Sequence, residues 1–189
     1  LFPIINKKMN RYIQNLLKIN EYEADKIRQE YWMCYGSTLK GLIRNYDVNP
    51  NNFLNKTHDI KNYSDLIFPA YNLVRILSNL NGRKILFTNA PKIYALNIIN
   101  HCNIGRFFQD FHFIENSNFN GKPSKESMKK FLSKYRIEQA YFVDDEKENL
   151  KVAKCCGIKT IWINKSKKKP IYIDKKITSL KELQKLRLL

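Results

Sequence analysis

A short apolar run that ends in two adjacent carboxylates constrains the fold of this chain more than any other segment. The run is Tyr141–Val143, Asp144 and Asp145 follow it, and Lys147–Cys156 have the pattern of a helix. This order predicts a buried strand of a parallel sheet followed by its helix. Ligands of open α/β sheets bind beyond the carboxyl ends of the strands. Because adjacent carboxylates repel each other unless a cation lies beside them, we expect Mg²⁺, which prefers oxygen ligands, at this position.

Downstream of Pro69, segments that suit strands alternate with segments that suit helices. The expected strands are residues 84–88, 111–114, 141–143 and 160–163. The expected helices are residues 71–80, 92–103, 124–135 and 147–156, with a short closing helix at 179–189. This alternation predicts an α/β fold, a Rossmann-like parallel sheet with helices on both faces.

The part of the chain before Pro69 has a helical pattern and no strand pattern. Apolar residues recur at helical spacing in 9–17 and in 24–34, where Gly36 is expected to end the second helix. Two shorter helices are expected at 38–46 and 51–58. We therefore predict a helical subdomain over residues 1–68 and an α/β core over residues 69–189.

The composition excludes several classes of protein. No apolar run approaches the roughly 20 residues of a membrane span, and the N-terminal segment lacks a secretory pattern. The four cysteines show no spacing typical of a metal site or a disulfide framework, which favours reduced thiols. We therefore expect a cytoplasmic protein with no membrane partner.

The formal net charge of +17 raises nucleic-acid binding as an alternative. The lysines are, however, spread along the whole chain beside abundant Ile and Asn, and the one dense cluster, at 165–169, follows an expected strand. No aromatic residues interleave that cluster to form a stacking surface. We therefore expect no nucleic-acid partner, while the charge favours anionic substrates.

Two further loops are expected at the carboxyl ends of core strands. Thr88 and Asn89 follow one strand, and a Thr hydroxyl with a free backbone N–H at a helix start can hold phosphate oxygens. Gly121, Lys122 and Pro123 precede a helix, and Lys122 supplies a compact positive charge. Each loop alone also fits an ordinary structural role, as a helix cap, a solvated turn or an acidic helix N-terminus.

The order Thr, Lys-Pro and Asp-Asp, each after an expected strand, resembles the haloacid dehalogenase-like (HAD) phosphohydrolases. The resemblance implies a HAD fold with a helical-bundle cap inserted after the first of four active-site loops, where the helical segment of this chain falls. The stretch 31–42, Tyr-Trp-Met-Cys-Tyr-Gly-Ser-Thr-Leu-Lys-Gly-Leu, is similar to the pyrimidine 5'-nucleotidase-type members. So are the segments 1–3, 49–50, 53–54, 58–60 and 82–90.

The resemblance implies a role for each candidate site residue. Thr88 would be catalytic and bind the transferring phosphoryl group, and Asn89 would assist in substrate binding. Lys122 would be catalytic and would bind substrate by neutralising the phosphoryl charge. Asp145 would coordinate Mg²⁺ directly, and Asp144 would be a direct or water-mediated second metal ligand. Asn149, four residues beyond the carboxylate pair, would support that loop.

One active-site loop of the family has no counterpart in the sequence. In the family the first loop carries a nucleophilic aspartate, an acid/base aspartate two residues later and a threonine. No D-x-D-x-T occurs before residue 69, where the first aspartate is Asp25. The resemblance therefore implies that the chain begins downstream of the nucleophile and of the first core strand, and that this chain alone is inactive.

The function expected for the complete protein is Mg²⁺-dependent hydrolysis of phosphomonoesters through an aspartyl-phosphate. The resemblance favours pyrimidine nucleoside monophosphates as substrates. Two alternatives stay open: another HAD phosphatase, acting on a sugar phosphate or phosphoglycolate, and an inactive basic protein that binds an anionic partner. A dehalogenase is disfavoured, because dehalogenases of the family need no metal and the carboxylate pair suits one. The sequence gives no expectation for the oligomeric state.

Overall fold

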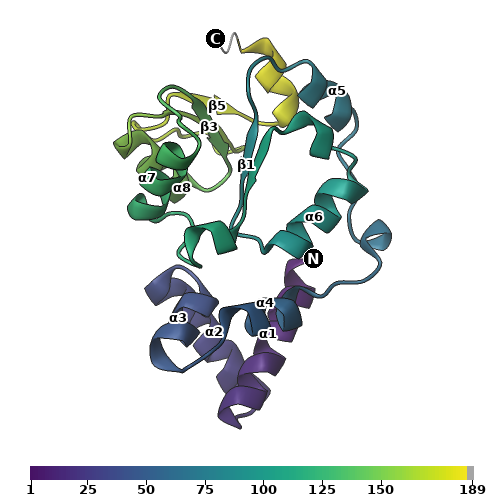
Figure 1. The fold of residues 1–189 in the computed structure, drawn as a ribbon, viewed down its shortest axis with the longest axis vertical. Helices are drawn as coiled ribbons and strands as arrows, with labels where there is room; N and C mark the ends of the chain where they lie inside the picture. The colour runs from purple at the N-terminus through teal and green to yellow at the C-terminus, as the bar shows by residue number, and fades with distance from the viewer. Residues whose placement is uncertain (187–189) are drawn as a thin grey trace. The chain divides into compact units, whose positions relative to one another are not determined.

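The protein forms two compact units in the computed structural model, which describes residues 1–186 (Figure 1). The first unit contains Leu1–Phe68 and Ala90–His101. The second contains Pro69–Asn89 and the chain from Cys102 onward. The assignment of residues 1–68 as a cap and 69–189 as a core stays a prediction, since a grouping of the chain into units assigns no role to either.

The first unit is entirely helical. Its helices are α1 (Phe2–Leu17), α2 (Glu21–Tyr35), α3 (Thr38–Asn45), α4 (Pro50–His58), the 3₁₀ turn η1 (Tyr63–Asp65) and α6 (Lys92–His101). The side chain of Asn20 accepts a hydrogen bond from the Glu23 N–H at the start of α2. Gly36 ends α2 with a left-handed φ of 78°, as its position in the sequence predicts. Ile13, Leu42 and Phe53 are each fully buried in this unit.

The part of the second unit that the structure describes contains five strands, all paired in parallel. They are β1 (Ile85–Phe87), β2 (Asp110–His112), β3 (Tyr141–Asp144), β4 (Lys159–Ile163) and β5 (Lys175–Ile177). They form two sheets, β1-β2 and β3-β4-β5. The helical elements are α5 (Leu73–Ser78), α7 (Lys125–Lys134), α8 (Lys147–Cys155), η2 (Gly105–Phe107), η3 (Ile114–Ser117) and η4 (Leu180–Lys185). The predicted α/β fold with parallel strands is confirmed. No described helix is long and apolar enough to cross a membrane.

Several elements differ from the sequence-based expectation, among them β5, the closing segment and α5. Strand β5 is not predicted, because Lys175 and Lys176 interrupt any apolar run and only Ile177 of this edge strand is buried. The closing segment is a 3₁₀ helix over Leu180–Lys185 rather than an α-helix, and the last residues of that expectation lie outside the described part of the chain. Helix α5 covers only Leu73–Ser78 of the ten residues expected.

A cluster of apolar side chains packs the two sheets against the same helices. Met128 and Phe131 of α7 lie in it, and the Phe87 ring of β1 stacks on Phe131 at a centroid distance of 4.3 Å. Phe142 of β3 packs against the same cluster, 6.3 Å from the Phe87 ring. Helices α7 and α8 lie beside β3 in Figure 1. β1 and β3 are therefore held near each other by side-chain packing rather than by strand pairing.

His112 lies at the end of β2 inside this core. Its side chain is 1% exposed, and its Nε2 lies 2.8 Å from the hydroxyl of Ser117. Its Nδ1 is buried and has no hydrogen-bond partner. Burial in this apolar surrounding, with a smaller effect of Lys134, lowers the pKa of His112 to about 4.

We expect His112 to make the fold sensitive to acid. Its pKa is about 4 in the folded protein, against 6.5 for a free histidine side chain, so the unfolded state binds more protons between these values. The free energy of unfolding therefore falls as the pH drops from 6.5 towards 4, by up to about 3 kcal/mol. Denaturant titrations followed by circular dichroism at pH values across this window measure the loss.

The substitution His112→Phe isolates this contribution. It removes the titrating ring at a cost of about 1 kcal/mol for the lost Ser117 contact above the window. The pH dependence of the free energy of unfolding should then be smaller by the contribution of His112. His58 would still contribute, because burial lowers its pKa to about 4 as well. An unchanged pH dependence in the Phe variant would assign the acid loss to other groups.

Candidate active site

A reciprocal pair of hydrogen bonds joins two of the loops singled out in the sequence. The Asn89 Nδ2 donates to the Lys122 carbonyl at 2.7 Å, and the Lys122 N–H donates to the Asn89 Oδ1 at 2.8 Å. Asn89 follows β1, while Lys122 precedes α7, whose first turn is capped by Ser124 as predicted. Both polar atoms of the Asn89 amide therefore hold the Lys122 backbone in place.

Gly121 allows this close approach. A Cβ atom at this position would lie 2.1 Å from the Asn89 Oδ1 and 2.7 Å from the Cδ1 of Ile114. Both distances are far below van der Waals contact. Only glycine therefore fits beside the Asn89 amide without a shift of the Asn89 and Ile114 side chains.

We expect Gly121→Ala to separate the two loops. The added methyl group forces Asn89 away from Lys122, which costs about 1–3 kcal/mol by the usual scale of overpacking. Urea denaturation measures the loss in the free energy of unfolding. In the double variant with Asn89→Ala the alanine at 121 should cost less, because the clashing amide is gone. Strictly additive costs would show that the clash lies elsewhere.

A buried ion pair joins the Lys122 loop to the end of β3. The Lys122 Nζ lies 2.7 Å from the Asp144 Oδ2, and the two side chains are 12% and 5% exposed. The same ammonium group lies 5.3 Å from the ring centroids of both Phe87 and Phe142. Two aromatic rings, one from each sheet, thus lie beside the Lys122 ammonium group, which pairs with the Asp144 carboxylate.

Asp144 is held by more than its lysine. Its Oδ1 accepts a hydrogen bond from the Glu146 N–H at 2.9 Å. The Nδ2 of Asn149, a buried residue of α8, lies 3.1 Å and 3.2 Å from the two Asp144 oxygens. These donors satisfy a carboxylate that would otherwise be costly to bury. Asn149 therefore fixes the orientation of Asp144.

Asp145 differs from Asp144 in both exposure and partners. Its side chain is exposed, and the described part of the chain offers its carboxylate no hydrogen bond or ion pair. Its backbone carbonyl accepts a hydrogen bond from the Trp162 indole N–H at 2.8 Å. This buried side chain of β4 therefore anchors the carboxylate loop.

Thr88 lies at the end of β1, next to Asn89. Its backbone N–H donates to the His112 carbonyl at 2.9 Å, which extends the pairing of β1 with β2 by one residue. The structure thus brings Asn89, Lys122 and Asp144 into one hydrogen-bonded chain and places Thr88 and Asp145 at its two ends. The roles of these residues in catalysis and binding stay predictions.

The carboxylate pair has the donor chemistry that a Mg²⁺ ion requires. Mg²⁺ is usually held by one or two carboxylates, with waters and substrate phosphate completing its coordination. Asp145 offers an exposed carboxylate, and Asp144 a second one that already pairs with Lys122. Among the described residues there is no group of three or more acidic, His or Cys side chains that could hold a metal ion. The two aspartates fit the ion as part of a site rather than as a complete protein cage.

We expect the Lys122–Asp144 pair to be important for stability. Lys122→Met leaves the buried carboxylate without its cation, which costs about 3–5 kcal/mol. Adding Asp144→Asn removes the unpaired charge, so the double variant should be less destabilised than the sum of the two single variants. Denaturant titrations measure all three. Lys125→Met, an exposed neighbour on α7, is the matched control and should change stability by less than about 0.5 kcal/mol.

Comparison with known proteins identifies the family. The sequence model described as haloacid dehalogenase-like hydrolase matches residues 5–163. The chain therefore belongs to the haloacid dehalogenase-like hydrolase family. This confirms the resemblance found in the sequence at the level of the family.

A curated relative and several solved structures agree with this family. Phosphate metabolism protein 8 of Saccharomyces cerevisiae is 23% identical over 178 residues, which cover 82% of this chain and 53% of the yeast protein. This chain thus spans about half the length of that curated relative. The crystal structure of a HAD phosphatase from Thermococcus onnurineus matches with a TM-score of 0.64 and 19% identity, covering 97% of this chain and 88% of the other.

Two other solved structures show the breadth of the fold. The HAD-hydrolase YfnB from Bacillus subtilis, bound to magnesium, matches with a TM-score of 0.57 and 18% identity, covering 96% of this chain and 90% of the other. An L-2-haloacid dehalogenase from Xanthobacter autotrophicus matches with a TM-score of 0.58 and 12% identity, covering 96% of this chain and 83% of the other. At these identities the likeness shows the fold alone.

Proposed function

We propose that this chain is the larger part of a Mg²⁺-dependent phosphomonoester hydrolase that acts on pyrimidine nucleoside monophosphates. The observation that carries the proposal is the buried Lys122–Asp144 pair at the carboxyl end of β3, directly beside the exposed Asp145. It places a fixed cation next to an unpaired carboxylate at the edge where α/β sheets bind ligands.

The fixed cation suits a phosphate ester. A lysine ammonium has three donors, and the Asp144 contact uses one of them. The remaining donors can bind phosphoryl oxygens, while the Asn89 amide holds the Lys122 backbone so that the charge stays in position. Thr88, one residue before that amide, would donate to the phosphoryl group from the end of β1. Phosphoryl transfer depends mainly on such positioning and charge neutralisation.

Mg²⁺ would be held by Asp145 and, directly or through water, by Asp144. Bound there, the ion would supply further positive charge for the phosphoryl oxygens. The protein's own contribution is orientation. Asn149 and the Glu146 N–H hold the Asp144 carboxylate, and Trp162 holds the Asp145 backbone.

The nucleophile in this proposal is an aspartate of a strand that lies upstream of Leu1 in the complete protein. Its carboxylate oxygen attacks phosphorus, the ester oxygen leaves as the alcohol, and water then hydrolyses the aspartyl-phosphate to release phosphate. Support comes from the sheets: within the described residues β1 pairs only with β2, and β3 only with β4. A strand between β1 and β3 would join the two sheets next to Lys122. This chain alone is then inactive.

The choice of substrate rests on the similarity of residues 31–42 to the pyrimidine 5'-nucleotidase-type members. The yeast relative is named for phosphate metabolism, and the Thermococcus structure is described as a phosphatase, which agrees with a phosphate ester. The carboxylate pair beside Lys122 favours a phosphatase over the dehalogenases that share the fold. The alternatives are another phosphatase of the family, acting on a sugar phosphate or phosphoglycolate, and an inactive protein that binds anions.

A substrate panel on the complete protein tests this proposal. We expect Mg²⁺-dependent release of phosphate from UMP and CMP, faster than from AMP, sugar phosphates or phosphoglycolate. Lys122→Ala should lower kcat/KM by about 10²–10³-fold, since it removes a preorganised charge at the phosphoryl group. Asp145→Asn should raise the Mg²⁺ concentration needed for half-maximal rate. Colorimetric phosphate detection measures each rate.

Glu148→Gln, an exposed acid on α8, is the matched control for Asp145→Asn and should leave the Mg²⁺ requirement unchanged. Equal rates on all the monophosphates would remove the pyrimidine assignment and leave a general phosphatase. No hydrolysis of any ester, by a folded protein that still binds phosphate, would favour the inactive alternative.

A further inference from the structure

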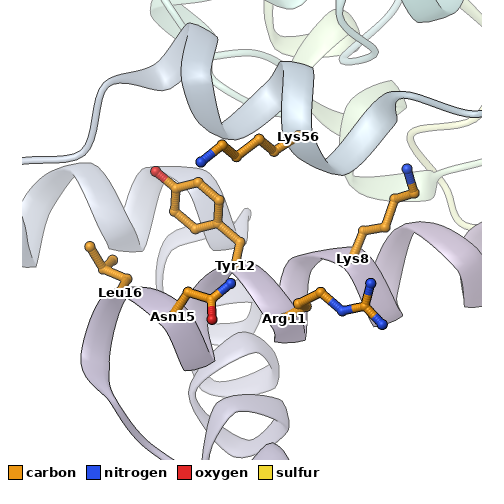
Figure 2. Close-up of a pocket in the computed structure, with 6 residues that line it drawn as sticks. All are labelled: Lys8, Arg11, Tyr12, Asn15, Leu16 and Lys56. Atoms are coloured by element: carbon orange, nitrogen blue, oxygen red, sulfur yellow. The ribbon is translucent and has the colours of Figure 1, made fainter.

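An open, cation-lined cavity lies on the surface of the helical unit beside α1 and α4, and four of its six lining residues, Arg11, Asn15, Leu16 and Lys56, are exposed. Its volume is about 520 Å³. Figure 2 shows the six side chains that line it, Lys8, Arg11, Tyr12, Asn15 and Leu16 from α1 and Lys56 from α4. The residues from α1 follow helical spacing, so they form one face of that helix. The size is within the range of sites that bind small molecules.

The lining carries three positive charges and no negative one. Neither α1 nor α4 contains an aspartate or a glutamate. None of the ion pairs within residues 1–186 involves Lys8, Arg11 or Lys56. Acids do occur in the same unit, but four of them lie on α2, outside the cavity lining. The positive charge of the cavity is therefore not balanced by its own side chains, which favours an anionic ligand.

Several donors in the cavity have no internal partner. The side chains of Arg11 and Asn15 and the Tyr12 hydroxyl make no hydrogen bond with another described residue. The Lys8 ammonium donates to the carbonyl of Asp59, which follows α4, and so ties the two helices together. The guanidinium group offers a planar fork that matches two phosphate oxygens, and lysines add point charges.

Packing holds the floor of the cavity in place. The Tyr12 ring meets the fully buried Phe53 edge-on at a centroid distance of 5.0 Å. The Lys56 ammonium lies 5.8 Å from the Tyr12 ring centroid, and Figure 2 shows Lys56 reaching from α4 towards that ring. This cation–π contact directs the exposed Lys56 side chain towards Tyr12.

We propose that this cavity binds the polyphosphate chain of a small molecule. Three cations in one cavity match the charge of a tripolyphosphate better than that of a single phosphate. The chemistry is shared by inorganic polyphosphate and by nucleoside triphosphates, whose base would find Tyr12 and Leu16 as apolar surface. A nucleic acid is disfavoured because the lining offers a single aromatic ring rather than a row of stacking rings.

Isothermal titration calorimetry on the full chain, at about 0.15 M ionic strength, tests the proposal. The probes are sodium tripolyphosphate, UTP, orthophosphate and a single-stranded oligouridylate. We expect one tripolyphosphate per chain, bound more tightly than orthophosphate. Tighter binding of UTP than of tripolyphosphate identifies a nucleotide as the ligand, and equal binding identifies the phosphate chain alone.

Variants separate the cavity from the overall charge and from the candidate active site. The triple variant Lys8→Gln/Arg11→Gln/Lys56→Gln should lose at least about 30-fold in affinity for tripolyphosphate. The matched triple Lys7→Gln/Lys18→Gln/Lys26→Gln, in the same unit outside the lining, should stay within about threefold of the unmodified chain. Lys122→Ala should also leave this binding in place.

The proposal is overturned if the two triple variants lose the same affinity for tripolyphosphate, because the overall charge of the protein would then account for the binding. Loss of binding in Lys122→Ala would assign the ligand to the other unit. Tighter binding of oligouridylate than of tripolyphosphate would indicate a nucleic-acid surface instead. No measurable binding of tripolyphosphate at this ionic strength overturns it as well. Circular dichroism of each variant shows whether the helical unit is intact, so that a loss of affinity is not a loss of fold.

Discussion

The buried pair between Lys122 and Asp144 is the interaction on which the geometry of the candidate site in the second unit depends. The lysine belongs to the loop before α7, the aspartate ends β3, and the two rings around the ammonium come from different sheets. A single charge therefore links a loop and two sheets that share no strand pairing. Without its partner, either member would be an unpaired charge that is largely shielded from water. Loss of the pair would therefore disturb the candidate site and destabilise the fold.

Much of the structure of both units follows from local sequence, because alternating apolar runs and helical periods are local properties. The strand ending at Asp144, the Ser124 cap and the Gly36 terminus all depend on a few neighbouring residues. The sequence also singled out the carboxylate pair, which directly follows an apolar run, and Lys122, which lies in a Gly-Lys-Pro loop before a helix. Strand β5 was not predicted because lysines occupy most of it, and this edge strand buries only one side chain.

What the sequence could not predict depends on contacts between distant segments. Asn89 was expected to assist in substrate binding, and the sequence did not indicate that both amide atoms bind the backbone of a residue 33 positions away. The bond from Trp162 to the Asp145 carbonyl requires the register in which Asp144 lies opposite Trp162 across β3 and β4. The cation cavity likewise requires α1 and α4 to lie together. Helical periodicity gives the face of each helix but not its partner.

The placement of the tryptophans gives each unit its own optical reporter. The chain has two, Trp32 on α2, which is 64% exposed, and Trp162 on β4, which is 6% exposed. An exposed indole emits at longer wavelength than a buried one, so their fluorescence is separable in colour. Trp162 is bonded to the backbone of the residue expected to meet the metal, while Trp32 belongs to the unit that contains the cation cavity. Binding at the two candidate sites should thus change the fluorescence of different tryptophans, so both sites can be followed in the same unlabelled protein.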